Sequence, residues 1–390
     1  MLICNDAKQC SRNDNNYNNS CNNIKENSLE FEYDVCKKRI NKLRAKLRDN
    51  SIDGVLISKR ENCFYLSGFT GTHSYIIITE NESLLITDSR YAEQAAREAP
   101  NYNVIVFYSN VYEEIKNIIK KYRIKSLGFE STYISYSTYL DYVNNFEVKK
   151  LVPLKDFIEE MRIIKDDEEI KLIRNSIKIA DEAFEYVLMY IKPGIREIEI
   201  AAEIEYFIKK QGGSGPSFQT IVASGIRSSM PHAVASEKKL ENGDIVVMDY
   251  GAIYHGYCSD ITRTIFIGKP DEKAKHIYNT VLEAQLEALK RIRKGMASKD
   301  ADCIARNVIS KAGYGENFGH SLGHGVGLEI HEKPKLYSTD ETIIKDGMVV
   351  TIEPGVYIKG CVGVRIEDMV LIKDTGTEIL TKASKEIIML

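Results

Sequence analysis

The 390-residue sequence lacks long apolar runs, paired cysteines and an excess of charge of one sign. No window reaches the ~18 consecutive apolar residues of a membrane span, and the chain turns polar after Cys4, so we expect no membrane association and no secretory signal. The eight cysteines are scattered without a C-x-x-C pair, which favours reduced thiols in a cytoplasmic protein over a disulfide or zinc framework. Lys plus Arg total 53 against 56 Asp plus Glu, so no global basic field is available to bind nucleic acid.

The composition is that of a globular protein, because hydrophobic residues make up 43% and charged residues 28%. A single hydrophobic core stops growing near ~250 to 300 residues, so the length predicts two or three domains. Residues 1–30 are rich in Asn and Ser without a periodic apolar pattern, which predicts a disordered extension. Short β-rich runs alternate with helical stretches over residues 33–152, as in an α/β domain. A second domain is expected over residues 160–390.

Local patterns place several strands and one long helix. Strands are expected at Gly54–Ser58, Tyr75–Thr79, Leu84–Thr87, Val104–Tyr108 and Leu127–Glu130. The long helix begins after Asp166, because Glu169 follows three residues later as in a capping box and acidic residues fill the first turn. Its apolar residues keep the spacing of one buried face, and Pro193 and Gly194 end it.

The second domain contains an internal repeat. Two units share the pattern Ile-x-x-Gly, a helix and a further glycine: Ile191–Gly194 with Gly212, and Ile292–Gly295 with Gly313. Each unit is followed by a glycine turn, an apolar run and an acid six residues after the first glycine: Asp249 after Gly243 and Glu353 after Gly347. Coincidence among common turn residues is the alternative interpretation. A true repeat predicts two similar halves whose strand-end acids converge on one point.

Two further acids lie in apolar runs that indicate second strands: Asp260 within Tyr257–Thr264 and Glu367 within Val364–Val370. Taken singly, each acid is better explained as a surface group in an ion pair. Taken as four, with two in each half, they indicate a shared counter-ion. Carboxylates crowded together without cations raise one another's pKa and repel, whereas two divalent metal ions would balance four negative charges.

Histidines supply a fifth candidate ligand. Three of the seven histidines fall within twelve residues: His320, His324 and His331. Glycines around His324 allow close backbone approach. A neutral imidazole among carboxylates suits Mn(II), Fe(II) or Co(II) better than a thiolate zinc site does. Two such ions would hold an attacking hydroxide at neutral pH, as metal hydrolases do.

Six sequence blocks together resemble the creatinase and methionine aminopeptidase superfamily, peptidase family M24. They are most similar to its proline-specific members, aminopeptidase P and prolidase. The blocks are Met230–Ala233, Val247–Gly251, Ser259–Thr264, Gly319–Glu332, Thr351–Gly355 and Gly363–Asp368. Upstream, Tyr65–Gly71 and Thr87–Tyr91 are similar to the creatinase-type N-terminal domain. The resemblance implies a two-domain α/β protein, in which a creatinase-type α/β domain is followed by a pseudo-symmetric "pita-bread" α+β catalytic domain.

The resemblance also implies a set of metal ligands. Asp249 would bind one metal ion, and Asp260 and Glu367 would bridge both. His324 would complete the site on the second ion. Glu353 would bind that ion and shuttle the proton of the attacking water.

Four other residues match positions that contact the substrate in the family. His232, His320 and His331 match histidines that bind substrate or stabilise the transition state. Arg365 matches an arginine of the proline-specific members, and an ordinary ion pair with an acid is its alternative role. For the other three histidines, His73, His255 and His276, surface or core positions are the better interpretation.

The implied activity is that of an Xaa-Pro aminopeptidase, which hydrolyses the bond between an N-terminal residue and a following proline in short peptides. Two divalent metal ions are expected, Mn2+ first, Co2+ or Fe2+ next and Zn2+ last. Xaa-Pro dipeptidase (prolidase) is the alternative, because the loops that would close the cleft cannot be inferred from the sequence. A catalytically inactive protein-binding module is the alternative from another class. A cytoplasmic homodimer is expected.

Overall fold

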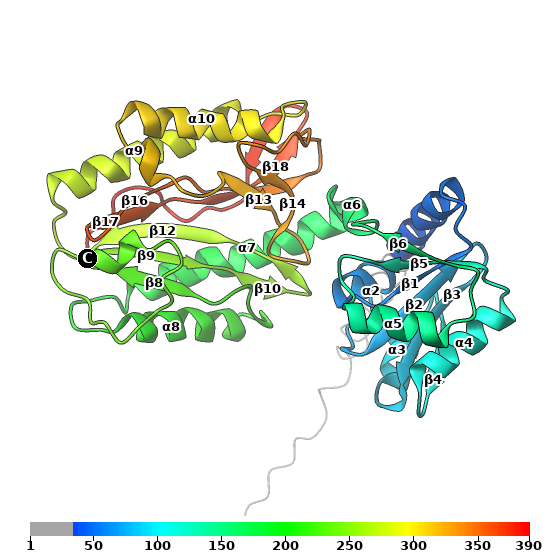
Figure 1. Ribbon diagram of the computed structural model, residues 1–390. Helices are drawn as coiled ribbons and strands as arrows, with labels where there is room; N and C mark the ends of the chain where they lie inside the picture. Colours follow the sequence, from blue (N-terminus) through cyan, green and yellow to red (C-terminus); the bar gives the residue numbers. More distant parts are fainter. Residues whose placement is uncertain (1–33) are drawn as a thin grey trace, which may run out of the picture. The chain divides into compact units, whose positions relative to one another are not determined.

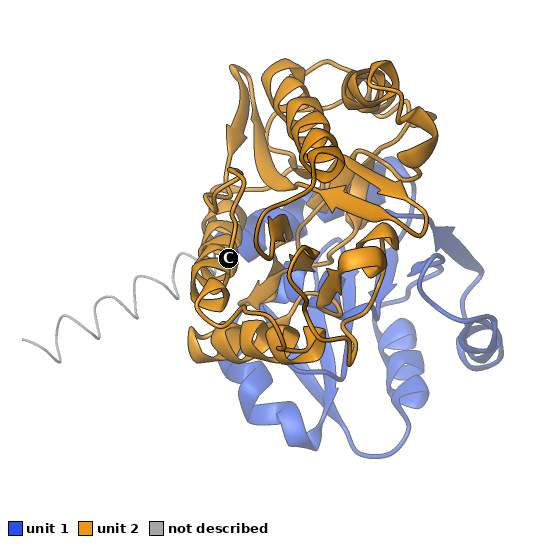
Figure 2. Cartoon of the chain, turned by 90° about the vertical axis from the view of Figure 1, so that its left-hand side faces the viewer, with its two compact units in different colours: residues 1–158 blue, residues 159–390 orange. Residues whose placement is uncertain are grey.

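The computed structural model describes residues 34–390, so the extension predicted over residues 1–30 lies outside the described residues. The chain divides into two compact units between Ile158 and Glu159 (Figure 2). We refer to residues 34–158 as unit 1 and to residues 159–390 as unit 2. Among residues 34–390, none of the helices combines the length and the apolar composition that a membrane crossing requires.

Unit 1 is built on one six-stranded sheet with the order β4-β3-β2-β1-β5-β6 (Figure 1). Its strands are β1 (Gly54–Ile57), β2 (Ser74–Thr79), β3 (Ser83–Asp88), β4 (Asn103–Phe107), β5 (Ser126–Glu130) and β6 (Lys150–Leu154). Strand β2 runs antiparallel to both β1 and β3, and the other neighbouring strands are parallel. All five strands predicted for this region are confirmed to within one residue at each end.

Helices complete unit 1. They are residues 34–49, α2 (Arg60–Ser67), α3 (Ala92–Glu98), α4 (Val111–Lys121) and α5 (Tyr136–Asn145), with a short 3-10 turn, η1 (Ser89–Tyr91). Helix α4 shows how the sequence encodes its packing. Asn110 caps it by accepting a hydrogen bond from the amide of Tyr112 (2.9 Å), and Ile115, Ile118 and Ile119 form one buried face. This face packs against buried side chains of the sheet and forms one hydrophobic cluster with them.

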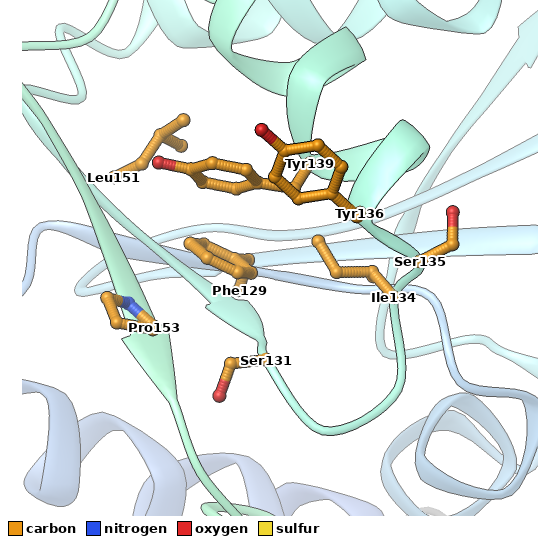
Figure 3. Close-up of a pocket in the computed structure, with 8 residues that line it drawn as sticks. All are labelled: Phe129, Ser131, Ile134, Ser135, Tyr136, Tyr139, Leu151 and Pro153. Atoms are coloured by element: carbon orange, nitrogen blue, oxygen red, sulfur yellow. The ribbon is translucent and has the colours of Figure 1, made fainter.

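Unit 1 also contains a pocket of about 390 Å³ beside β5, β6 and α5 (Figure 3). Its lining residues are aromatic, aliphatic or hydroxylated: Phe129, Ser131, Ile134, Ser135, Tyr136, Tyr139, Leu151 and Pro153. No carboxylate, imidazole, thiol or amine lines it. The pocket therefore lacks the side chains that commonly bind metal ions.

In unit 2, strands lie between two pairs of helices, with α7 and α8 on one side and α9 and α10 on the other (Figure 1). The helices are α6 (Glu159–Arg162), α7 (Asp167–Leu188), α8 (Glu197–Lys210), α9 (Glu272–Arg291) and α10 (Ser298–Lys311), with 3-10 turns η2 (Gly225–Ser229) and η3 (Gly315–Asn317). The capping box of α7 is confirmed, since Asp166 and Glu169 each accept a hydrogen bond from the other's amide. The helix ends at Leu188, five residues before the proline that the sequence offers as its limit.

The strands of unit 2 form four small sheets. Three of them have the orders β11-β10-β7, β12-β9-β8 and β14-β13-β15-β18-β19, and β16 pairs with β17. The strands of the first half are β7 (Gly215–Pro216), β8 (Ile221–Ser224), β9 (Ile245–Tyr250), β10 (Ala252–Tyr254), β11 (Tyr257–Cys258) and β12 (Ile261–Phe266). Those of the second half are β13 (Gly323–Gly325), β14 (Glu332–Leu336), β15 (Val349–Ile352), β16 (Gly355–Ile358), β17 (Val362–Arg365), β18 (Asp368–Lys373) and β19 (Gly376–Ile379).

The internal repeat is confirmed by matching elements and by matching backbone conformations. Helices α8 and α10 have the same length, 14 residues, and equivalent glycines have nearly the same positive φ. The pairs are Gly194 (94°) with Gly295 (87°), Gly212 (90°) with Gly313 (87°), and Gly243 (94°) with Gly347 (81°). Only glycine adopts this left-handed conformation without strain, which is why the repeat is visible as glycines in the sequence.

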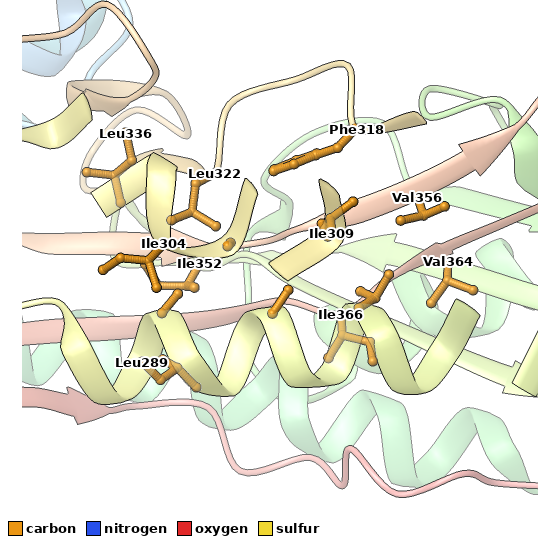
Figure 4. Close-up of a cluster of buried hydrophobic side chains, with 14 of the residues drawn as sticks. Leu289, Ile304, Ile309, Phe318, Leu322, Leu336, Ile352, Val356, Val364 and Ile366 are labelled. Atoms are coloured by element: carbon orange, nitrogen blue, oxygen red, sulfur yellow. The ribbon is translucent and has the colours of Figure 1, made fainter. Parts of the chain in front are cut away.

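Each half has its own buried core. One cluster packs α7 and α8 against β8, β9 and β12. The other packs α9 and α10 against the strands of the second half, with Leu289, Ile304, Ile352 and Ile366 among its members (Figure 4). These cores hold the strand ends of both halves in fixed positions, and the strand ends carry the predicted acids.

Candidate active site

Four acids stand at the ends of paired strands in unit 2. Asp249 lies in β9, and Asp260 immediately precedes β12, the antiparallel partner in which Thr262 faces Asp249. In the other half, Glu353 immediately follows β15, and Glu367 immediately precedes β18, the antiparallel partner of β15. The two halves thus place their acids in the same way.

Two acids interrupt the strands in which the sequence places them. Continuous strands are predicted over Tyr257–Thr264 and Val364–Val370, but the structure breaks the first at Asp260 and the second at Glu367, so this part of the prediction is wrong. The reason is a change of hydrogen-bond partner. The amide of Glu367 donates to the carbonyl of Thr262 (3.2 Å), which links the two halves instead of extending a ladder.

The acids of the two halves meet in one buried cluster. Asp249, Asp260 and Glu367 each offer a carboxylate oxygen, and these oxygens lie within 4.8 Å of one another. Oδ1 of Asp249 and Oε1 of Glu367 are buried and lack a hydrogen-bond partner among the described residues. A buried polar atom without a partner costs about 1–3 kcal/mol, and a bound cation would remove that cost.

His324 aims a lone pair at the same cluster. Its Nδ1 lies 3.0 Å from the carbonyl oxygen of Gly325, and since a carbonyl can only accept, Nδ1 carries the proton. Burial lowers the pKa of His324 to about 4, so the ring is neutral and Nε2 is unprotonated. Nε2 lies 3.5 Å from Oδ2 of Asp260 and 3.3 Å from Oε1 of Glu353. A lone pair beside two carboxylates forms a donor set that fits a cation.

The electrostatics of the cluster agree with this geometry. Burial and the neighbouring acids raise the pKa of Asp260 and of Glu367 well above their ordinary values. Burial raises the pKa of Glu353 to about 8, although Arg365 opposes the shift. Carboxylate oxygens with one neutral imidazole form a donor set that suits divalent cations such as Mn2+. The residues present therefore fit a metal centre.

Thr262 and Arg365 orient two carboxylates of the cluster through hydrogen bonds. The hydroxyl of Thr262 donates to Oε2 of Glu367 (2.7 Å), which leaves Oε1 of that acid turned toward the cluster. Arg365 donates from Nε to the hydroxyl of Thr262 (3.0 Å) and from Nη2 to Asp249. The predicted ion pair of Arg365 with an acid is present. Thr262 was not singled out from the sequence, where only its place in the block Ser259–Thr264 marks it.

His320 is held by the protein at both ring nitrogens. Its Nδ1 donates to the carbonyl of Ser321 (2.8 Å), and its Nε2 lies 3.0 Å from the hydroxyl of Tyr357. That hydroxyl accepts a hydrogen bond from Nη1 of Arg365 (2.7 Å), so its own proton is directed to Nε2 of His320. Burial, followed by the nearby Arg365, lowers the pKa of His320 to about 3 and keeps the ring neutral. Sequence reasoning missed Tyr357.

The other two predicted histidines, His232 and His331, are near the cluster but are not part of its buried set. The ring centroid of His331 is 4.4 Å from that of His324, and both His331 and His232 are exposed. Burial, followed by the charge of Lys335, lowers the pKa of His331. Lys335 faces His324 across the β13–β14 pair and is exposed. Sequence reasoning did not single out Lys335.

Comparison with known families identifies the chain. Residues 171–374 match metallopeptidase family M24, and residues 39–164 match the creatinase/prolidase N-terminal domain. The first match alone spans more than half of the chain. The chain belongs to metallopeptidase family M24. The predicted two-domain fold class is thereby confirmed, and the chain is a hydrolase of peptide bonds.

Several relatives of this M24 peptidase have proline-specific names. An Xaa-Pro dipeptidase of Pyrococcus horikoshii is 44% identical over 361 residues, which cover 91% of this chain and 100% of the relative. The structure of an Xaa-Pro dipeptidase from Bacillus anthracis superimposes with a TM-score of 0.89 at 44% identity and covers 91% of this chain and 100% of that one. The structure of an X-Pro aminopeptidase from Thermotoga maritima superimposes with a TM-score of 0.84 at 41% identity. The match covers 87% of this chain and 98% of that one.

Proposed function

We propose that this M24 peptidase is an Xaa-Pro dipeptidase, which cleaves a dipeptide whose second residue is proline. The observation that carries the proposal is the buried set of carboxylates and one neutral imidazole in a chain that is 44% identical to Xaa-Pro dipeptidases over about nine-tenths of its length. The sequence favoured Xaa-Pro aminopeptidase and kept dipeptidase as the alternative. The names of the relatives support the alternative better.

The proposed ligands are Asp249, Asp260, His324, Glu353 and Glu367. Two divalent metal ions held there would polarise the scissile carbonyl and make a water molecule acidic enough to attack at neutral pH. Mn2+ is the first candidate, because oxygen donors with a single nitrogen suit it better than they suit zinc. The free amine of the substrate would lie near the metal-bound carboxylates.

The other residues would position the substrate and its protons. Glu353 would hold the proton of the attacking water on a carboxylate oxygen and pass it to the leaving imide nitrogen. His232 and His331 would donate hydrogen bonds to the tetrahedral species as its charge develops. His320 would act through Tyr357 instead of touching the substrate, because both of its ring nitrogens already have protein partners.

Lys335 supports the choice of a dipeptide. A dipeptide carries its carboxylate directly on the proline, whereas a longer peptide has an amide there. The exposed ammonium of Lys335 is close enough to His331 and His324 to influence the pKa of both. We propose that it pairs with the C-terminal carboxylate of the dipeptide, an interaction that only a dipeptide can make at this position.

Turnover of Ala-Pro and of Ala-Pro-Ala by Mn2+-loaded protein tests the proposal. Ala-Pro is expected to have the higher kcat/KM. Lys335→Met should lower kcat/KM for Ala-Pro about 10-fold or more, with little change for Ala-Pro-Ala. Lys345→Met, at another exposed lysine, is the matched control. A preference for Ala-Pro-Ala would establish the aminopeptidase instead, and a chain that binds Mn2+ but hydrolyses neither peptide would support the binding-module alternative.

Several expectations from the sequence stay predictions. They are a homodimer, a cytoplasmic location and domain limits at residues 33–152 and 160–390. Sedimentation equilibrium of the purified chain tests the first. A mass equal to one chain at micromolar concentration would contradict it.

A further inference from the structure

A buried network of charged side chains contacts the backbone of Glu367 outside the acid cluster. Arg263 and Asp368 are each about 1% exposed, and Nη2 of Arg263 donates to Oδ1 of Asp368 (2.8 Å). The ammonium of Lys385 donates to Oδ2 of the same acid. Arg263 belongs to β12 of the first half, and Asp368 begins β18 of the second half. None of these three residues has a part in the proposed reaction.

Arg263 holds the backbone at the place where the two halves meet. Its Nη1 donates to the carbonyl of Thr262 (2.9 Å) and to the carbonyl of Glu367. These are the two residues that the hydrogen bond from the Thr262 hydroxyl to Oε2 of Glu367 joins. A shift of the guanidinium would therefore move a proposed ligand and the group that orients it.

A segment distant in sequence fixes the guanidinium and its acid. We name residues 381–385 the strap. It supplies the hydroxyl of Thr381 to Oδ1 of Asp368 (2.6 Å), the ammonium of Lys385 to Oδ2, and the carbonyl of Ala383 to Nη2 of Arg263 (2.8 Å). Gln285 gives Oδ2 a further donor (2.7 Å). Each oxygen of Asp368 thus accepts two hydrogen bonds.

The strap is itself tied to both helix layers of unit 2. The carboxylate of Asp181, on α7, accepts hydrogen bonds from the amides of Lys382 and Ala383 (2.9–3.0 Å). The hydroxyl of Tyr278, on α9, donates to the carbonyl of Lys385 (3.2 Å). The position of the strap is therefore set by the same helices that support the two strand systems.

We propose that the strap is a positioning element for the metal centre: through Asp368 and Arg263 it fixes Glu367 in the orientation in which its free oxygen faces the cluster. This inference rests on the proposed function, because it takes Glu367 as a ligand. Groups that hold metal ligands in place contribute to metal affinity even though they do not touch the metal. Arg263, Asp368 and Lys385 are positioning residues in this sense.

Stability alone does not account for the network. Burying charges costs several kcal/mol per ion, and replacing a buried ion pair by apolar residues of similar volume is often neutral or stabilising. A network of three charged groups, one of which donates to the backbone carbonyl of Glu367, is better explained by the geometry that it imposes. Lys385 offers the mildest test, because its side chain is 19% exposed and can be replaced with little disturbance of the core.

The experiment uses the full chain, freed of metal and then titrated with Mn2+ alone in a calorimeter. Lys385→Met is expected to bind Mn2+ about 10- to 100-fold more weakly than the wild type. The absorption spectrum of the Co2+-loaded variant should also change, because the ligand field changes when Glu367 moves. Lys385→Arg should restore affinity. Lys382→Met, which replaces an exposed lysine of the same strap, should bind like the wild type.

The possible failures are distinguishable. A Lys385→Met protein with a lower melting temperature but unchanged Mn2+ affinity and Co2+ spectrum would reduce the strap to a structural element and overturn this inference alone. A wild-type chain that takes up no Mn2+ would overturn the proposed function and this inference with it. If Lys385→Met does not fold, Thr381→Val, which removes one donor to Asp368, supplies the same comparison.

Discussion

Two groups of acids in unit 2 have buried side chains but opposite electrostatics: Asp260 and Glu367 form one group, and Glu332 and Asp368 form the other. Asp260 and Glu367 have raised pKa values, because burial disfavours their charge and neighbouring acids add to the effect. Burial also opposes the ionisation of Glu332, but Lys165 and Arg162 outweigh it and lower the pKa of that acid to about 2. Nζ of Lys165 lies 3.0 Å from Oε2 of Glu332, and Nη2 of Arg162 donates to Oε1 of the same acid.

The difference separates a structural acid from a candidate ligand. An acid that no metal ion neutralises is supplied with protein cations, as Glu332 and Asp368 are. At the cluster, Arg365 pairs with Asp249 only, and the remaining acids face one another. A bound cation would relieve such repulsion among buried acids. Burial alone would not have distinguished the two groups.

The largest effect is expected from neutralising an acid of the cluster. Asp260→Asn should abolish both Ala-Pro hydrolysis and Mn2+ binding, because the substitution removes a charged ligand. The metal-free variant should at the same time unfold at an equal or higher urea concentration than the wild type, since one repulsive charge is gone. Activity assays, metal titration and urea unfolding check these outcomes, with Asp346→Asn as the exposed control. Near-normal turnover by Asp260→Asn would contradict the assignment of Asp260 as a metal ligand.

Neutralising the paired acid should have the opposite effect on stability. Glu332→Gln removes the negative charge that Arg162 and Lys165 share. Arg162 keeps its ion pair with Glu329 (2.9 Å), but Lys165 stays buried without its acid, and breaking a buried pair costs about 3–5 kcal/mol. The midpoint of urea unfolding of the metal-free protein should fall accordingly, whereas Glu283→Gln, on the exposed side of α9, should leave it unchanged. Equal midpoints for Glu332→Gln and the wild type would remove the distinction between the two groups of acids.

The contribution of Glu332 should also depend on pH in a defined window. Its pKa falls from 4.5 to about 2 on folding, so its stabilisation is complete above about pH 4.5 and is lost as pH falls toward 2. This shift corresponds to roughly 3 kcal/mol at about 1.4 kcal/mol per pKa unit. The difference in unfolding free energy between the wild type and Glu332→Gln should be constant from pH 7 to 5 and shrink below pH 4.5. A difference that grows on acidification would contradict the pairing.

Sequence reasoning anticipated the acids because their signals are local. The repeat places Asp249 and Glu353 each six residues after a turn glycine, which has a positive φ in the structure, and each acid ends an apolar run. A charge in such a run is conspicuous, since burying it needs a partner. The strands and the capping box of α7 were equally predictable, because alternation and capping act over a few residues.

The groups that surround the acids were not predictable in the same way. Arg162 and Glu332 are 170 residues apart, and Lys385 and Asp368 meet through a strap whose path depends on two helices. Tyr357 resembles an ordinary strand aromatic until His320 and Arg365 are placed beside it. Such contacts are set by the packing of whole layers, and no local pattern encodes them. The breaks in the strands at the acids have the same origin.

Thr262 gives the last and smallest test of the comparison, because it is a neutral donor to an acid of the repulsive group. Thr262→Val keeps the shape of the side chain but removes the hydrogen bond to Oε2 of Glu367 (2.7 Å). Loss of such an orienting group typically costs about 10- to 100-fold in metal affinity or activity. Thr262→Ser, which keeps the hydroxyl, should stay close to the wild type. If Thr262→Val and Thr262→Ser lose activity equally, packing and not the hydrogen bond holds the carboxylate of Glu367 in place. The strap would then contribute more to the orientation of Glu367 than Thr262 does.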